Sequence, residues 1–476
     1  MMNMNNIGAL AVIGIPVIAS VLILLQGFAF NGDRKKIVML SLIFGLLELG
    51  AVSYISYLTI TSQFSSALNG IIVYDGFAVI PMMFGAFILQ LVLSSTALEF
   101  SSPQKMAIFS SSSFMVMLGS FLLATSSSIA LFISAWLLLS ISSYTAIAAS
   151  KTKTSSDASI KYALMGAMST VFIVMWLGTG IYLPGDNIYS ASWYGSGKLL
   201  LLASAFLIAG VGFKLGIVPF QWWMPDVYSS AEGKAIALIT GVAKMGAILG
   251  FTRMIYYTFY IGPSYQLILF IAAISILTMT FGNIAALTTN IFPRILAYSS
   301  IAQIGYILVG VVGMLYGAST GDEQLIYLAS GGIAVQTIGY GLSKSGAFLF
   351  SGELGIAAQY EKIKGLYKSD SSSTASLALF LLSLLGLPPL IGFWGKLYLF
   401  ESAISYSLVL VLIAIINSGI SSFYYGRLIS ALFSDGSSSD QKMKLKTSYI
   451  ALSILILLLG LGIIQLLFPY LKIKPI

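Results

Sequence analysis

The sequence contains no cysteine and no histidine, and only 8% of its 476 residues are charged. Without cysteine and histidine the chain can form no disulfide, no zinc finger and no Ser-His-Asp triad. Haem ligation by histidine and iron–sulfur clusters held by cysteine are excluded for the same reason. A soluble domain usually has about 25% charged residues, so the composition also excludes a water-soluble enzyme and a disordered protein.

What the sequence has instead is a series of long apolar runs, and 58% of its residues are hydrophobic. A helix needs about 20 apolar residues to cross the hydrocarbon of a bilayer, and these runs are too long for strands. We therefore expect an all-α integral membrane protein, a single polytopic domain over 1–476. About fourteen transmembrane helices are predicted, at 7–30, 37–60, 72–97, 104–124, 127–150, 160–183, 198–220, 234–258, 264–288, 294–317, 324–352, 374–400, 404–432 and 447–470.

The basic residues lie unevenly between the two sides of this arrangement. Sixteen of the 24 Lys and Arg residues fall in connections on one side, and four fall on the other, namely Lys198, Arg253, Lys472 and Lys474. Basic loops stay in the cytoplasm, so we predict a multi-pass protein of the cytoplasmic membrane with both termini outside. The net charge of +8 is then explained by these loops and the lipid surface rather than by nucleic acid. Trp222 and Trp223 are interpreted as anchors at the membrane boundary.

Similar fragments recur at an offset of about 170 residues and indicate an internal repeat of five helices. An odd number of spans requires the second copy to be inverted in the membrane, an arrangement that places a transport site near the midplane. The predicted divisions are three N-terminal helices in 1–100, a first repeat in 104–258, a second repeat in 264–432 and a final helix in 447–470.

Two of the predicted spans carry signals for an interruption of the helix. Pro219 lies near the end of one span, and Pro388 and Pro389 lie in the middle of another. Proline removes a backbone donor, and a freed carbonyl is tolerated at membrane depth only where it faces protein or water. A simple packing kink is the alternative interpretation.

Five charged residues fall inside predicted spans: Lys214, Lys244, Lys344, Lys396 and Glu48. A charge at the bilayer centre costs about 2.5–3.5 kcal/mol on insertion scales. Burial disfavours the charged form of a lysine, so a buried lysine can take up and release a proton. The four lysines are therefore predicted to form a proton relay across the protein at one depth. The alternative is that each lysine snorkels to the membrane surface.

Other polar residues lie close to these spans. Asp226 is interpreted either as a gate or as an ordinary surface charge, whereas Asp75 and Glu232 are interpreted as surface charges near span ends. Gln221 and Gln303 are predicted to orient water beside the relay helices.

Four motifs in order resemble the antiporter-like subunits of respiratory complex I, most of all subunit N. The predicted number of spans is also that of the family. The motifs are IKYALMGA at 160–167, FKLGIVPFQWWMPDVY at 213–228, LAYSSIAQIGY at 296–306 and LLGLPPLIGFWGK at 384–396.

The resemblance implies a proton-translocating, N-type membrane subunit of an NADH–quinone oxidoreductase. By motif position, Lys214, Lys244 and Lys396 would form the proton path, driven by quinone reduction elsewhere in the complex. The resemblance implies no redox centre and no cofactor in this chain. Quinone, flavin and iron–sulfur clusters are expected in partner subunits, which include other membrane subunits and a peripheral redox arm.

The sequence departs from the family pattern at several positions. Leu137 stands where the family has a glutamate that partners the lysine at position 214, and Glu48 is a candidate substitute. Gln221 and Gln303 stand where histidine is common, and Lys344 is more typical of the sister subunits L and M.

Two alternatives therefore stay open. The chain could instead belong to a multisubunit Na⁺/H⁺ antiporter or a membrane-bound hydrogenase, or it could be a scaffold subunit that no longer pumps because of Leu137.

Overall fold

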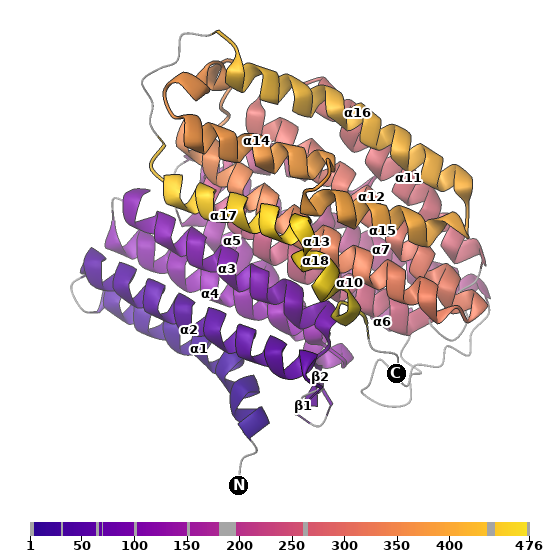
Figure 1. The fold of residues 1–476 in the computed structure, drawn as a ribbon. Helices are drawn as coiled ribbons and strands as arrows, with labels where there is room; N and C mark the ends of the chain where they lie inside the picture. The colour runs from indigo at the N-terminus through magenta and orange to yellow at the C-terminus, as the bar shows by residue number, and fades with distance from the viewer. Residues whose placement is uncertain are drawn as a thin grey trace.

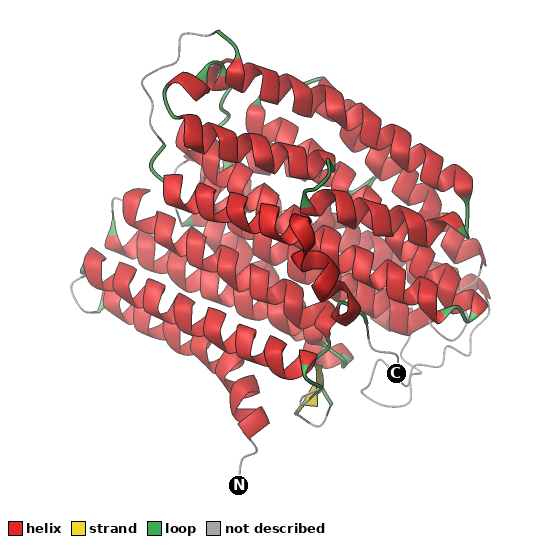
Figure 2. Ribbon diagram, viewed as in Figure 1, coloured by secondary structure: helices red, strands yellow, loops and turns green. Residues whose placement is uncertain are grey.

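The computed structural model describes residues 4–29, 32–62, 66–68, 70–99, 102–149, 153–179, 197–259, 265–435 and 443–473. The described chain is almost entirely helical, as Figure 2 shows, and this confirms the all-α prediction. One small antiparallel sheet pairs β1 (Ser66–Ala67) with β2 (Ile72–Val73).

Twelve helices in the described ranges are long and apolar enough to cross a membrane. Most of them match the predicted spans within a few residues. They are α1 (Met4–Phe28), α2 (Arg34–Ile60), α3 (Gly76–Glu99), α4 (Pro103–Thr125), α5 (Ile129–Ala148), α6 (Lys153–Thr179), the continuous stretch of α9 (Gly233–Leu238), η2 (Ile239–Ala243) and α10 (Lys244–Phe259), α11 (Tyr265–Leu287), α12 (Phe292–Thr320), α13 (Glu323–Leu354), α16 (Leu408–Phe433), and the stretch of α17 (Lys446–Leu458), η5 (Leu459–Ile463), α18 (Ile464–Leu467) and η6 (Phe468–Tyr470).

The two remaining predicted spans are each interrupted. The run at 198–220 forms α7 (Gly197–Leu215), which ends before Pro219 and is followed by the short helix α8 (Trp223–Ser230). The run at 374–400 forms α14 (Ser371–Leu385) and α15 (Ile391–Ile404), with the two prolines in the gap between them. Two short 3₁₀ helices, η3 (Tyr360–Ile363) and η4 (Leu366–Lys368), precede α14.

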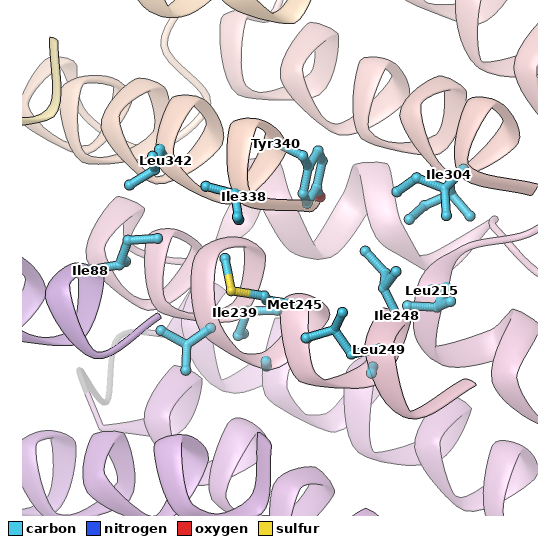
Figure 3. Packing of buried hydrophobic residues seen from close by; sticks show 14 of the residues in the cluster. Ile88, Leu215, Ile239, Met245, Ile248, Leu249, Ile304, Ile338, Tyr340 and Leu342 are labelled. Atoms are coloured by element: carbon cyan, nitrogen blue, oxygen red, sulfur yellow. The ribbon is translucent and has the colours of Figure 1, made fainter. Parts of the chain in front are cut away.

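The helices pack roughly side by side, with α1–α4 grouped at one end of the molecule (Figure 1). Helix α13 lies at the centre and contacts α3, α9, α12, α14, α15 and α17. Figure 3 shows part of this packing, in which Ile88 of α3, Met245 of α10 and Ile338 of α13 meet in a common apolar cluster. The polar side chains described next must therefore find their partners inside an apolar protein.

Candidate functional site

The interruption after α7 is built by a glycine. Gly216 has a backbone φ of +80°, a conformation that costs about 1–2 kcal/mol for most other residues. The amides of Gly216 and Ile217 both donate to the carbonyl of Gly212, at 2.8 and 2.9 Å, and the amide of Phe220 donates to Ile217 at 2.7 Å. The helix therefore ends directly after Lys214, at Leu215.

The interruption after α14 repeats this pattern. Gly386 has a φ of +89°. The amides of Gly386 and Leu387 donate to the carbonyl of Leu382, at 3.0 and 3.2 Å, and the amide of Leu390 donates to Leu387 at 3.0 Å. Each of these hydrogen bonds has a counterpart 170 positions earlier in the chain, in the break that follows α7.

Lys214 lies in the last turn of α7 and is 4% exposed. Its ammonium donates to the hydroxyl of Ser140 on α5 at 2.9 Å. The rings of Trp136, Tyr144 and Tyr162 surround it, with centroids 5.7–5.8 Å from Nζ. No described carboxylate forms an ion pair with Lys214, so a hydroxyl and three aromatic faces stabilise its charge.

Lys244 follows the π-helical turn η2 and is 2% exposed. A π-turn within a helix is frequent at functional sites. The Nζ atom lies 3.3 Å from the sulfur of Met224 and faces the rings of Tyr228 and Tyr340, at 5.5 and 5.9 Å.

Aromatic side chains connect the surroundings of these two lysines. Tyr162, beside Lys214, stacks on Trp223 with centroids 4.7 Å apart, and Trp223 meets the edge of Tyr228 at 6.0 Å. Tyr228 in turn faces Lys244. The two lysines thus border one continuous aromatic cluster.

Lys344 on α13 is fully buried. Its ammonium donates to the carbonyl of Leu296 at 2.6 Å and to the hydroxyl of Ser299, both on α12. The buried ammonium of Lys344 is therefore accommodated by a carbonyl and a hydroxyl of the neighbouring helix α12.

Lys396 on α15 is 5% exposed and bonds to the interruption itself. Its ammonium donates to the carbonyl of Leu385, the last residue of α14, at 2.7 Å and to the hydroxyl of Ser418 at 2.9 Å. The ring of Tyr306 lies 4.7 Å from Nζ.

A pair of glutamines lies beside the same break and occupies the carbonyl of Leu384, which the interruption also leaves free. Gln303 donates to the carbonyl of Leu384 at 2.8 Å and accepts from Gln336 at 2.7 Å. Gln303 is thus fixed beside Lys396 and the break. Gln221 is also buried, but neither of its amide atoms has a hydrogen-bond partner among the described residues, so it is free to bond water.

Comparison with known protein families shows which family has this sequence. Residues 126–421 match the family described as NADH:quinone oxidoreductase/Mrp antiporter, transmembrane. The chain belongs to this family. It is an antiporter-like membrane subunit, as the motifs around Lys214 and Lys396 indicated.

Individual relatives agree with the family. The chain is 30% identical over 460 residues to NADH-quinone oxidoreductase subunit N of Sulfurimonas denitrificans, and the alignment covers 90% of this chain and 87% of that protein. It is similar to a chain of respiratory complex I from Thermus thermophilus, with a TM-score of 0.81, 25% identity and coverage of 97% and 99%. It also shares the fold of a chain of the Mrp complex from Dietzia sp., with a TM-score of 0.81, 16% identity and coverage of 99% and 97%.

The glutamate that the family places near Lys214 has no replacement in the described contacts of this lysine. Leu137 is 39% exposed on α5, one turn before Ser140. Glu48 is fully buried on α2, whose main neighbours are α1, α3 and α4. The structure therefore does not support Glu48 as a substitute.

Asp226 lies at the surface of this antiporter-like subunit. It is 42% exposed and pairs with Lys161 at 3.4 Å and with Arg294, so it joins α6, α8 and α12. Glu232 is also partly exposed and pairs with Lys234 at 3.1 Å.

Four sequence-based interpretations are wrong. Asp75, expected at the surface, is fully buried, and Arg253, assigned to an outer connection, pairs with it at 2.6 Å. Lys234, one of the sixteen basic residues assigned to connections on one side, is 3% exposed. Trp223 is no membrane anchor, because it is 4% exposed and donates to the carbonyl of Phe213 at 2.7 Å, whereas Trp222 is 69% exposed.

Metal ligands do not gather in the described part of the chain. No group of three or more Asp, Glu, His or Cys side chains there could hold a metal ion. The polar groups described above are lysines, hydroxyls, amides and aromatic rings.

Proposed function

We propose that this chain is the N-type subunit of a complex I-like NADH–quinone oxidoreductase and moves protons through Lys214, Lys244, Lys344 and Lys396. Quinone reduction in partner subunits would drive the movement, and the redox cofactors would be held there. The observation that carries the proposal is the placement of four buried ammonium groups on polar protein atoms or aromatic faces next to interrupted helices.

Fourteen spans with both termini outside the cytoplasmic membrane fit this proposal. The twelve long helices and the two interrupted ones give this number. The matching hydrogen bonds of the two breaks, 170 residues apart, support a repeat of five helices. With an odd number of helices, the second copy would be inverted.

A relay requires that each lysine can exist both charged and neutral. A charge at the bilayer centre costs about 2.5–3.5 kcal/mol. A hydrogen bond to a charged group contributes about 1.5–3 kcal/mol, and a desolvated cation–π contact about 2 kcal/mol. Lys214 has one such bond and three rings around it. The bond and the rings are together large enough to offset the cost of the charge, so Lys214 can hold a proton at this depth.

Each lysine then has a defined part in the transfer. Lys214 would hold a proton against Ser140, and Lys244 would receive it across the shared aromatic cluster with the help of water. Lys344 and Lys396 would continue the path through α13 and α15. Gln303 would keep the freed carbonyl of Leu384 hydrogen-bonded, so that this carbonyl does not compete for the ammonium of Lys396.

The test is proton pumping in membrane vesicles that contain the whole assembly. Lys214→Met and Lys396→Met should each abolish pumping coupled to electron transfer while the assembly remains intact. Lys446→Met, at an exposed lysine at the start of α17, is the matched control and should pump normally. Normal pumping by both variants at the buried lysines would contradict the relay.

The fold of the Mrp complex chain favours a second candidate, a subunit of a cation/proton antiporter. Mild detergent extraction and identification of the copurifying chains separate the two. A peripheral quinone-reducing arm supports the first proposal, and a set of small antiporter subunits supports the second.

A further inference from the structure

The group of helices α1–α4 contains a carboxylic acid that the lysine relay does not use. Glu48 lies midway along α2 and is fully buried. Neither of its carboxyl oxygens has a hydrogen-bond partner among the described residues. Other described acids differ in this respect, since Asp75 and Asp226 are paired with arginines and Glu353 accepts a hydrogen bond from Tyr449.

A second unpaired acceptor lies close to Glu48. Gly45 precedes Glu48 by one turn on the same buried face of α2. A Cβ atom built on Gly45 would lie 2.1 Å from Oε1 of Gln90 on α3, so the glycine makes room for this side chain. Oε1 of Gln90 also lacks a hydrogen-bond partner. Three buried acceptor oxygens are thus gathered without a described donor.

The charges of these four helices leave Glu48 without a counter-ion. All the other charged residues of α1–α4 lie in terminal turns, namely Arg34, Lys35, Lys36, Glu99 and Lys105. An ionised carboxylate buried without a partner is strongly disfavoured, and such a group takes up a proton instead. A proton on Glu48 also supplies the donor that the three acceptors lack.

Hydroxyl groups lie between Glu48 and the end of α2 that carries Arg34. Ser41 is two turns closer to that end on the same buried face. On α4, Ser110 is fully buried, and its hydroxyl has no described partner. The hydroxyl of Ser41 donates to the carbonyl of Ile37 at 2.8 Å, whereas that of Ser110 is available to hold water.

We propose that Glu48 is a proton-binding site separate from the lysines, protonated at rest, and that hydrophobic carbodiimides modify it. In this reaction the carboxyl oxygen bonds to the central carbon of the carbodiimide, and the carboxyl proton moves to a nitrogen atom. The O-acylisourea then rearranges to an N-acylurea, so the whole reagent is added and no atom is lost.

The experiment treats the detergent-purified assembly with dicyclohexylcarbodiimide, without any electron donor, and identifies modified peptides by mass spectrometry. The adduct is expected on Glu48 and should be lost in Glu48→Gln. Glu353→Gln, at a partly exposed acid on α13 that accepts a hydrogen bond from Tyr449, is the control and should leave the adduct on Glu48 unchanged. An adduct yield on Glu48 no higher than on Glu353 would overturn the proposal.

Infrared spectroscopy gives an independent measurement. The band of a protonated carboxyl group should be present in the native protein, shift when H₂O is exchanged for D₂O, and disappear in Glu48→Gln. A band unchanged by the substitution would show that Glu48 is ionised and would overturn the proposal. Neither measurement involves pumping, so its outcome is separate from that of the lysine substitutions.

Discussion

The buried ion pair between Asp75 and Arg253 gives the sharpest prediction for stability. The two side chains are each 1% exposed, and their atoms approach to 2.6 Å. Nε of Arg253 also donates to the carbonyl of Ala124 at 2.9 Å. The pair therefore fastens the start of α3 and the end of α4 to α10, and connects the N-terminal helices to the helix that carries Lys244.

Removing one partner leaves the other charge buried without its counter-ion, which costs about 3–5 kcal/mol. Asp75→Leu and Arg253→Met should each lower the free energy of unfolding by about this amount. The double variant buries no charge at this place, so it should recover a large part of the loss. A coupling energy of about 3 kcal/mol, at the upper end of measured values, is expected.

The assay is thermal unfolding of the purified protein in detergent, for the native protein, both single variants and the double variant. Arg294→Met is the matched control, because Arg294 is 35% exposed in its pair with Asp226 and such pairs contribute only about 0–1 kcal/mol. A double variant whose loss equals the sum of the two single losses would refute the argument from buried charge.

Two further predictions concern backbone and capping groups. Burial alone would raise the pKa of Asp370, but hydrogen bonds from Ser373, Ser372 and Met443 hold this pKa below its usual value. The ionised carboxylate therefore stabilises the folded protein above the unfolded pKa of about 3.9, and this stabilisation is lost as the pH falls through the lower pKa of the folded protein. Asp370→Asn should reduce the melting temperature at pH 7. It should also make the melting temperature depend less on pH in acid. Gly216→Ala should destabilise the break by roughly the 1–2 kcal/mol of a left-handed backbone. Its Cβ would lie 2.1 Å from the terminal methyl carbon of Met224, and this flexible side chain can shift. Gly419→Ala, in an open part of α16, should leave melting and pumping unchanged.

The long helices and the two interruptions could be predicted from the sequence because each depends on local information. A run of apolar residues has one stable form in a bilayer, and a proline removes a backbone donor and so favours an interruption, although Pro16 and Pro81 lie inside continuous helices. The burial of the four lysines could be predicted from local sequence as well, because a lysine within a long apolar run lies inside the membrane span whatever packs around it. The contacts of Lys214 with Ser140 and Trp136 could not be predicted, because they depend on how α5 and α7 pack.

The errors in the prediction have one physical cause. Asp75 and Arg253 lie near the ends of their apolar runs, where charges normally meet water, and only the packing of α3 against α10 brings them together. Trp223 likewise follows a span, but the break in the helix folds it back under Tyr162. Near a helix end, sequence position does not determine burial, because the neighbouring helices decide it.

The two interruptions share their backbone hydrogen bonds, yet the groups around them differ in charge. In the second break the ammonium of Lys396 bonds to the freed carbonyl of Leu385. In the first, the neutral indole of Trp223 bonds to the carbonyl of Phe213, and Lys214 is left with a hydroxyl and aromatic rings.

The leucine at position 137, where the resemblance implies a glutamate, therefore concerns the first half alone, where no carbonyl of the described residues holds the lysine in place. If Lys396→Met stops pumping and Lys214→Met does not, the defect lies in the first half, and the chain conducts protons only through the second. If both variants stop pumping, the hydroxyl of Ser140 and three aromatic rings are sufficient for Lys214 to transfer protons without a carboxylate partner.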